Sequence, residues 1–185
     1  MKHILKPAIS LFFVAAVATV SLGIVHEVTY EPIAARRRQR QETMLREVLV
    51  EAGEFREIEA ALYGSMVRVF AGVYQGETVG YVVELAPVGY GGAINMMVGI
   101  SATRNLVTGM RVLRHAETPG FGAVITRENF FTRFDGLDLV PLTVARRAVG
   151  ANEFQAITSS TITTRAVVDA VNEAIGWYLR HRGET

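Results

Sequence analysis

The sequence predicts an α+β protein in which a single N-terminal transmembrane helix precedes an antiparallel-sheet domain with packed helices. Three observations support this fold class: an uncharged apolar run at residues 7–25, several β-rich runs between residues 66 and 115, and a helical pattern from Arg165 to His181. A chain of 185 residues holds one anchored domain and is too short for two of full size. The predicted segments are an N-terminal segment (1–6), the transmembrane helix (7–25), a linker with an amphipathic helix (26–52) and the main domain (53–185).

The predicted membrane span has the right length and lacks charge. Nineteen residues at helical rise cover roughly 28 Å, close to the thickness of the bilayer's hydrocarbon core. A cleaved signal peptide is the alternative, but the apolar run exceeds its usual length and no clear A-x-A site follows. Arg36, Arg37, Arg38 and Arg40 after the span favour a cytoplasmic domain, yet long domains cross membranes largely regardless of charge. Composition therefore leaves the side of the membrane open.

The segments after the span are distinguished by their hydrophobic period. From about residue 40, apolar side chains with helical spacing indicate a short amphipathic helix. A period of two then predicts consecutive antiparallel strands in a meander, separated by Gly- and Asn-containing turns. The helical stripe consists of Met44, Leu45, Val48 and Leu49, and the predicted strands are 66–74, 77–86, 92–101 and 106–115.

Two further elements and a final helix complete the predicted domain. Residues 128–134 indicate a short helix with Phe130, Phe131 and Phe134 facing the sheet, and residues 143–149 indicate one more strand. From Arg165 to about His181 apolar residues recur at helical spacing, behind a group of Ser and Thr residues at 158–164. The apolar stripe of this last helix consists of Val167, Val168, Val171, Ala174, Ile175 and Tyr178.

Composition excludes several classes of function. The net charge of +1 gives no reason to expect nucleic-acid binding. Without cysteine the chain forms no disulfide, no Cys-ligated zinc site and no ordinary iron–sulfur cluster. The four histidines are scattered without ligand spacing, so no metal site is predicted. Redox chemistry in this chain would need an organic cofactor.

Two stretches are candidates for a functional site. Residues 158–164 place six hydroxyls at the positive end of a helix, where free N–H groups and the helix dipole favour an anion such as phosphate. Simple N-capping explains the same residues. Residues 115–122, His-Ala-Glu-Thr-Pro-Gly-Phe-Gly, form a tight loop that lets backbone approach a ligand, although His115 and Glu117 also suit a surface ion pair.

Together the two motifs resemble a known family. Residues 115–122, the Gly-Tyr-Gly-Gly turn at 89–92 and the Ser/Thr motif followed by Arg-Ala-Val-Val, behind a lone span, resemble the RnfG/NqrC family of covalent FMN-binding proteins. RnfG belongs to the Rnf complex and NqrC to the sodium-pumping NADH:quinone oxidoreductase; the short length and Arg-Ala-Val-Val favour RnfG. The family motif, D-x-x-S/T-G-A-T, joins FMN through its phosphate to the final threonine, which matches Thr161. The chain departs from it at Gln155 in place of Asp, and at Ser159 and Ser160 in place of Gly-Ala.

The resemblance implies a set of cofactor-binding residues without a catalytic acid–base pair or a metal. The loop at 115–122 is expected to lie against the flavin ring, with His115 and Glu117 as lining residues. The expected cofactor-binding residues are Thr158, Ser159, Ser160, Thr161 (covalent FMN), Ile162, Thr163, His115, Glu117, Thr118, Pro119, Gly120 and Gly122, with Tyr90 and Gly91 from the turn.

The resemblance also implies a function. It indicates an electron-transfer protein with covalent FMN in an ion-translocating ferredoxin:NAD oxidoreductase of the bacterial cytoplasmic membrane, with its domain on the periplasmic side. The implied partners are the other membrane proteins of the complex, especially RnfD, which also carries covalent flavin, and RnfA and RnfE, together with a flavin transferase for maturation. The alternatives are NqrC of the quinone reductase, or a flavin-free structural or assembly component whose Ser/Thr cluster is only a helix cap.

Overall fold

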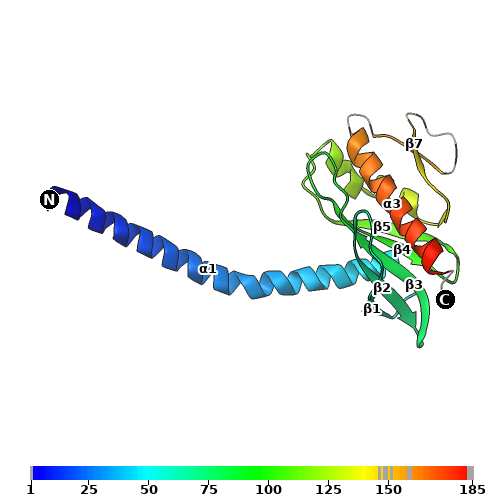
Figure 1. The fold of residues 1–185 in the computed structure, drawn as a ribbon, viewed down its shortest axis with the longest axis horizontal. Helices are drawn as coiled ribbons and strands as arrows, with labels where there is room; N and C mark the ends of the chain where they lie inside the picture. The colour runs from blue at the N-terminus through cyan, green and yellow to red at the C-terminus, as the bar shows by residue number, and fades with distance from the viewer. Residues whose placement is uncertain (1, 146, 148–149, 151, 158–159, 183–185) are drawn as a thin grey trace. The chain divides into compact units, whose positions relative to one another are not determined.

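The structure, a computed structural model, describes residues 2–145, 147, 150, 152–157 and 160–182. The chain divides into two compact units, Met1–Gln41 and Glu42–Thr185. In chain order the elements are α1 (Lys2–Val48), β1 (Glu54–Ile58), β2 (Met66–Tyr74), β3 (Glu77–Leu85), β4 (Asn95–Ser101), β5 (Leu106–Arg114), the 3-10 helix η1 (Gly122–Thr126), α2 (Glu128–Phe131), the 3-10 helix η2 (Thr132–Phe134), β6 (Leu137–Asp138), β7 (Thr143–Ala145), β8 (Glu153–Gln155) and α3 (Thr161–His181) (Figure 1).

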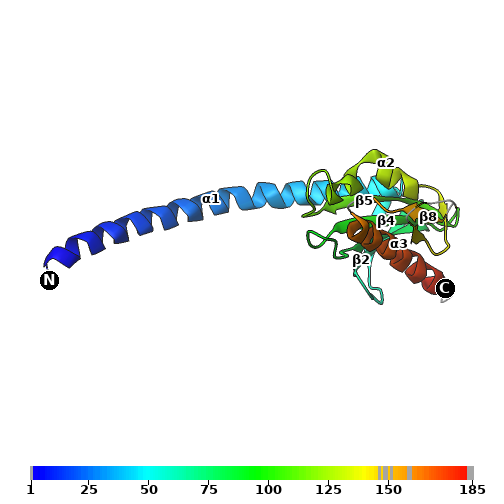
Figure 2. The same cartoon turned by 90° about the horizontal axis from the view of Figure 1, so that it is seen from above.

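The first unit is part of one uninterrupted helix, α1, which Figure 2 shows along its length. Within it Ile9–Glu27 is, among the described residues, the segment long and apolar enough to cross a membrane, with a mean hydropathy of 2.1. The sequence analysis expected residues 26–52 to be a linker with its own short helix. Instead α1 continues to Val48, because Ala, Arg, Gln and Glu, all strong helix formers, fill most of positions 34–47.

Six strands form one antiparallel meander in the order β1-β2-β3-β4-β5-β6. The four predicted strands are confirmed as β2 to β5. β4 begins at Asn95 rather than at residue 92, because Gly92 has a φ of 127° and belongs to the preceding turn. The strand β1 was not predicted, since three of its five residues are charged, and β6 has only two residues.

The strand predicted at residues 143–149 is shorter than expected. Only Thr143–Ala145 is described as a strand, and residues 146, 148 and 149 lie outside the described residues. This strand, β7, does not join the main sheet, because it pairs in parallel with β8 as a separate two-stranded sheet. It packs near α3, and it lies in the segment that leads to the start of that helix.

Both faces of the main sheet are buried, which explains why its strands are nearly continuous apolar runs. Alternate side chains point to opposite faces: Val83 and Val98 join the larger core with α3, whereas Val82 lies in the smaller core on the other side. Figure 1 shows α3 lying across the strands. The predicted apolar stripe of α3 is confirmed, since Val167, Val168, Val171, Ala174, Ile175 and Tyr178 are all buried.

The other face is covered by the end of α1 and the residues after it. Leu45, Val48 and Leu49 of the predicted stripe are buried there and Met44 is partly buried, which confirms the amphipathic pattern. Beyond the helix, the Glu51 carboxylate accepts hydrogen bonds from Ser101, Thr103 and Arg104. Burial raises the pKa of Glu51, but these hydrogen bonds and the charge of Arg104 outweigh burial, so the net pKa lies below its usual range.

The short helix predicted at residues 128–134 is confirmed as α2 followed by η2. Phe130 and Phe134 are buried in the larger core, while Phe131 is only partly buried beneath the guanidinium of Arg111, 4.1 Å from its ring centre. The last helix differs at its start. α3 begins at Thr161, four residues before the predicted Arg165, so part of the hydroxyl cluster is helical.

Candidate functional site

Three segments distant in sequence meet at the side chain of Glu117. Its Oε1 accepts a hydrogen bond from the backbone N–H of Gly91, 2.9 Å away, in the turn between β3 and β4. Its Oε2 accepts one from the hydroxyl of Thr163, also at 2.9 Å, in the first turn of α3. Glu117 is only 6% exposed. The carboxylate therefore joins the 89–92 turn, the 115–122 loop and the start of α3.

Glycines make room for this buried carboxylate. A Cβ at Gly122 would overlap Oε2 of Glu117 and lie 2.7 Å from its Cδ. A Cβ at Gly89 would overlap Oε1, and one at Gly91 would overlap the backbone carbonyl of Ala116. The glycines of the two motifs thus serve a steric purpose: they let three stretches of backbone close around one side chain.

The surface ion pair considered for His115 and Glu117 is wrong. Glu117 is buried, and its backbone N–H donates to Nδ1 of the partly buried His115 at 3.1 Å. This local hydrogen bond shapes the beginning of the loop. Farther along it, Thr118, Pro119 and Gly120 are exposed, and Gly120 has a φ of 81°, a conformation that glycine adopts readily.

The hydroxyls at the start of α3 have different surroundings. Thr163 donates to Glu117, and Thr164, also fully buried, donates to the carbonyl of Ser160. Ser160 is buried at the N-cap position and makes no side-chain capping bond. Thr161 is exposed. Among the four hydroxyl residues described here, Thr161 is therefore the one whose side chain is open to solvent; Thr158 and Ser159 lie outside the described residues.

The first turn of α3 also keeps hydrogen-bonding capacity. No acceptor from the described part of the chain reaches the backbone N–H groups of Thr161, Ile162 or Thr163. In the described residues N-capping therefore does not account for the hydroxyl cluster. A helix start with free N–H groups and a positive dipole end favours an anion.

A cavity of about 320 Å³ opens beside this helix start. Phe121, half exposed on its rim, was not among the predicted site residues, because in sequence it is merely the variable position between two glycines. The size lies at the lower end of the range for small-molecule sites, roughly 300–1,000 Å³. The residues that line the cavity are Tyr90, Glu117, Thr118, Phe121, Gly122 and Ser160.

The predicted residues outside this lining are close to it in sequence. Ile162 is exposed on α3, and Gly91 is exposed in its turn while its N–H binds Glu117. Gln155, at the position where the family has Asp, is exposed in β8. Among the described residues, no group of three His, Asp or Glu side chains has the arrangement of a metal site.

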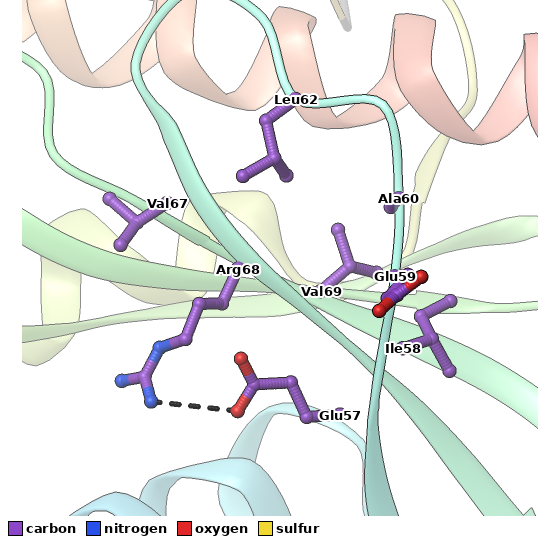
Figure 3. A pocket seen from close by; sticks show the side chains of 8 residues that line it. All are labelled: Glu57, Ile58, Glu59, Ala60, Leu62, Val67, Arg68 and Val69. Atoms are coloured by element: carbon purple, nitrogen blue, oxygen red, sulfur yellow. Dashed lines mark ion pairs between the residues drawn. The ribbon is translucent and has the colours of Figure 1, made fainter.

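A second hollow, of about 450 Å³, lies at the end of β1 and contains none of the predicted residues (Figure 3). Ile58, Leu62 and Val67 contribute apolar side chains to it, and Arg68 pairs with Glu57 at 3.7 Å and with Glu84 at 2.7 Å. Its arginine is thus already engaged by carboxylates, and it has no helix start beside it. The smaller cavity is the better candidate for a phosphate-containing ligand.

Comparison with known proteins agrees with the resemblance in the sequence. Residues 89–176 match the family described as FMN-binding domain, and residues 1–48 match the RnfG N-terminal region. The chain is 30% identical to the G subunit of an ion-translocating oxidoreductase complex of Methanosarcina acetivorans, over 98% of both chains. It is 32% identical to the G subunit of a Na(+)-translocating ferredoxin:NAD(+) oxidoreductase complex of Acetobacterium woodii, over 96% of this chain and 92% of the relative.

Solved structures share the fold of the domain. The chain is similar to NqrC of Shewanella oneidensis, with a TM-score of 0.50 and 24% identity over 57% of this chain and 53% of that one. The C subunit of a Na(+)-translocating NADH-quinone reductase from Parabacteroides distasonis gives a TM-score of 0.51 at 22% identity, over 60% of each chain. These likenesses concern the fold alone. The matches along nearly the whole length decide the family: the chain belongs to the RnfG family of ion-translocating oxidoreductase complexes, with an FMN-binding domain at residues 89–176.

Proposed function

We propose that this chain is the electron-transfer protein RnfG of an Rnf-type, ion-translocating ferredoxin:NAD oxidoreductase complex, and that it carries FMN joined through its phosphate to Thr161. Family membership supports the role in the complex. One observation supports the attachment site above all. Thr161 exposes its side chain at the start of α3, whereas the hydroxyls of Thr163 and Thr164 are buried and hydrogen-bonded.

The residues present fit a flavin phosphate. The free N–H groups of the first turn of α3 suit the phosphate charge, which helix ends stabilise by about 0.3–1 kcal/mol when exposed. The cavity offers the aromatic side chains of Tyr90 and Phe121 for contact with a ring system. FMN supplies electron transfer when bound, and the protein supplies binding, orientation and electrostatics.

Attachment is a phosphoryl-group transfer. A bond forms between Oγ1 of Thr161 and the flavin's phosphorus, a phosphoanhydride bond of an activated flavin nucleotide breaks, and the hydroxyl proton leaves to solvent. The chain gains the mass of FMN less one water. A flavin transferase must reach this hydroxyl, and the exposure of Thr161 allows that approach. The phosphodiester formed keeps one negative charge at the helix start.

The anchor and the partners follow from the same proposal. Ile9–Glu27 holds the chain in the membrane as a single span, and residues 53–185 form the flavin domain. The domain faces the periplasmic side, where family members receive their flavin. RnfD, RnfA and RnfE are the neighbours in the complex with which electrons are exchanged.

The attachment is tested by producing the chain with a flavin transferase and examining the denatured protein. We expect ultraviolet fluorescence on a denaturing gel and a mass increase of one FMN less water. Thr161→Ser keeps the hydroxyl and should keep the flavin, whereas Thr161→Val, a change at an exposed position, should lose it. Covalent flavin on Thr161→Val would refute the site. Flavin absent from the wild type, beside a family member labelled in the same cells, would refute the attachment.

The side of the membrane is tested with a single introduced cysteine, since the chain has none of its own. Val50→Cys is suitable, because Val50 is exposed just after the end of α1. A membrane-impermeant maleimide should label this variant in intact cells whose outer barrier has been opened. Labelling only after lysis would place the domain in the cytoplasm and contradict the proposal.

A further inference from the structure

We propose that Glu117 is a positioning residue whose buried negative charge holds the midpoint potential of the flavin low. This inference rests on the proposed function, because it requires the flavin to occupy the cavity beside α3. It concerns a residue that lines the cavity and whose burial is not explained by packing alone.

The hydrogen bonds of Glu117 are those of an ionised carboxylate. Both of its oxygens accept, one from the N–H of Gly91 and the other from the hydroxyl of Thr163. Its Thr163 contact also brings it to the positive end of the α3 dipole, which favours a negative charge. These neutral donors stabilise the charge without cancelling it.

The comparison with Glu84 shows how unusual this arrangement is. Glu84 is buried to a similar degree, 9% exposed, but its carboxylate pairs with Arg68 at 2.7 Å. Among the described residues, Glu117 forms no salt bridge. Buried glutamates are usually paired, because an unpaired buried charge lowers stability. The chain thus retains one uncompensated negative charge on the wall of the cavity.

Such a charge acts on any redox group in the cavity. Reduction adds negative charge to the group, and the fixed carboxylate raises the free energy of the reduced form. Two unit charges about 10 Å apart at an effective dielectric constant near 20 change an equilibrium on the order of tenfold. For a two-electron couple, a tenfold change in the ratio of reduced to oxidised flavin corresponds to roughly 30 mV.

The test compares Glu117→Gln with the matched control Glu84→Gln in the full-length chain, loaded by the transferase and held in detergent. Glutamine is isosteric, accepts the Gly91 bond and removes the charge. Spectroelectrochemical titration should give Glu117→Gln a midpoint potential roughly 30 mV more positive than the wild type, and Glu84→Gln an unchanged one. In the flavin-free chain, the infrared difference between wild type and Glu117→Gln should show an ionised carboxylate at neutral pH.

Four results would overturn this inference. The first is an unchanged potential in fully loaded Glu117→Gln, and the second is a protonated Glu117 in the infrared difference. The third is a folded Glu117→Gln that does not acquire flavin, which would assign the residue to attachment. The fourth is an unfolded Glu117→Gln beside a folded Thr163→Val, which would make the residue purely structural. A wild type without flavin would instead refute the proposed function itself.

Discussion

The steric fit between Gly122 and Glu117 predicts that Gly122→Ala lowers stability through one identified contact. The new Cβ would lie 2.7 Å from Cδ of Glu117 and 2.9 Å from its Cβ, about 1 Å closer than the optimal carbon–carbon separation. The carboxylate has no room to withdraw, because Gly89 packs against its other oxygen. Overpacking costs about 1–3 kcal/mol, and disturbing the hydrogen bonds of the buried carboxylate adds a similar amount.

We therefore expect Gly122→Ala to reduce the free energy of unfolding by about 3 kcal/mol, or roughly 6–12 °C in the melting temperature. The single tryptophan, Trp177, is buried in the core and reports unfolding by its fluorescence in urea. Gly53→Ala is the control, since its Cβ would meet only atoms at 3.7 Å. In a Glu117→Ala background the cost of Gly122→Ala should fall by at least about 1 kcal/mol, because the overlapping atoms are gone. Additive effects in this cycle, or a Gly122→Ala protein as stable as the control, would refute the reasoning.

Two more predictions concern the end of α1 on the sheet. Leu49→Ala should cost about 2–5 kcal/mol, because Leu49 is fully buried, while Val50→Ala at its exposed neighbour should change stability by less than about 0.5 kcal/mol; equal urea midpoints would contradict the packing. Glu51→Gln should be less stable than the wild type at neutral pH. Burial raises the pKa of Glu51, but its hydrogen bonds and Arg104 lower it more, so the carboxylate's contribution is present above the usual glutamate pKa and disappears as pH falls through the lower folded value. Melting curves of wild type and Glu51→Gln should therefore converge in acid, and a difference that persists there would argue against an electrostatic origin.

The sequence predicted the interior of the sheet because interior strands carry their own signal. Strands β2 to β5 are buried on both faces, and their apolar runs end at turns marked by Gly and Asn. The edge strand β1 has no such signal, since its residues are mostly charged and exposed. Its pairing with β2 depends on the partner strand, which no local pattern in residues 54–58 reveals.

The start of α3 was placed too late for a related reason. Thr161 to Thr164 have low intrinsic helix propensity, because hydroxyl and β-branched side chains favour caps and extended backbone. In the folded protein Thr163 is held by Glu117 and Thr164 by Ser160. These contacts stabilise a first helical turn that propensity alone does not predict, and one of them comes from a residue 46 positions away.

The same contacts explain why a pattern of hydroxyls could suggest a site but not rank its members. In sequence, residues 158–164 are six hydroxyls without distinction. In the structure, Thr163 and Thr164 are buried and hydrogen-bonded, and Thr161 is left exposed beside the cavity. Glu117, which in sequence could equally be a surface charge, buries one of these hydroxyls and lines the same cavity. If this reasoning holds, removing the Glu117 side chain should free Thr163 for solvent while leaving Thr164 bound to Ser160. Side-chain hydroxyl exchange in Glu117→Ala, compared with the wild type, would measure that selectivity directly, and equal acceleration at both threonines would contradict it.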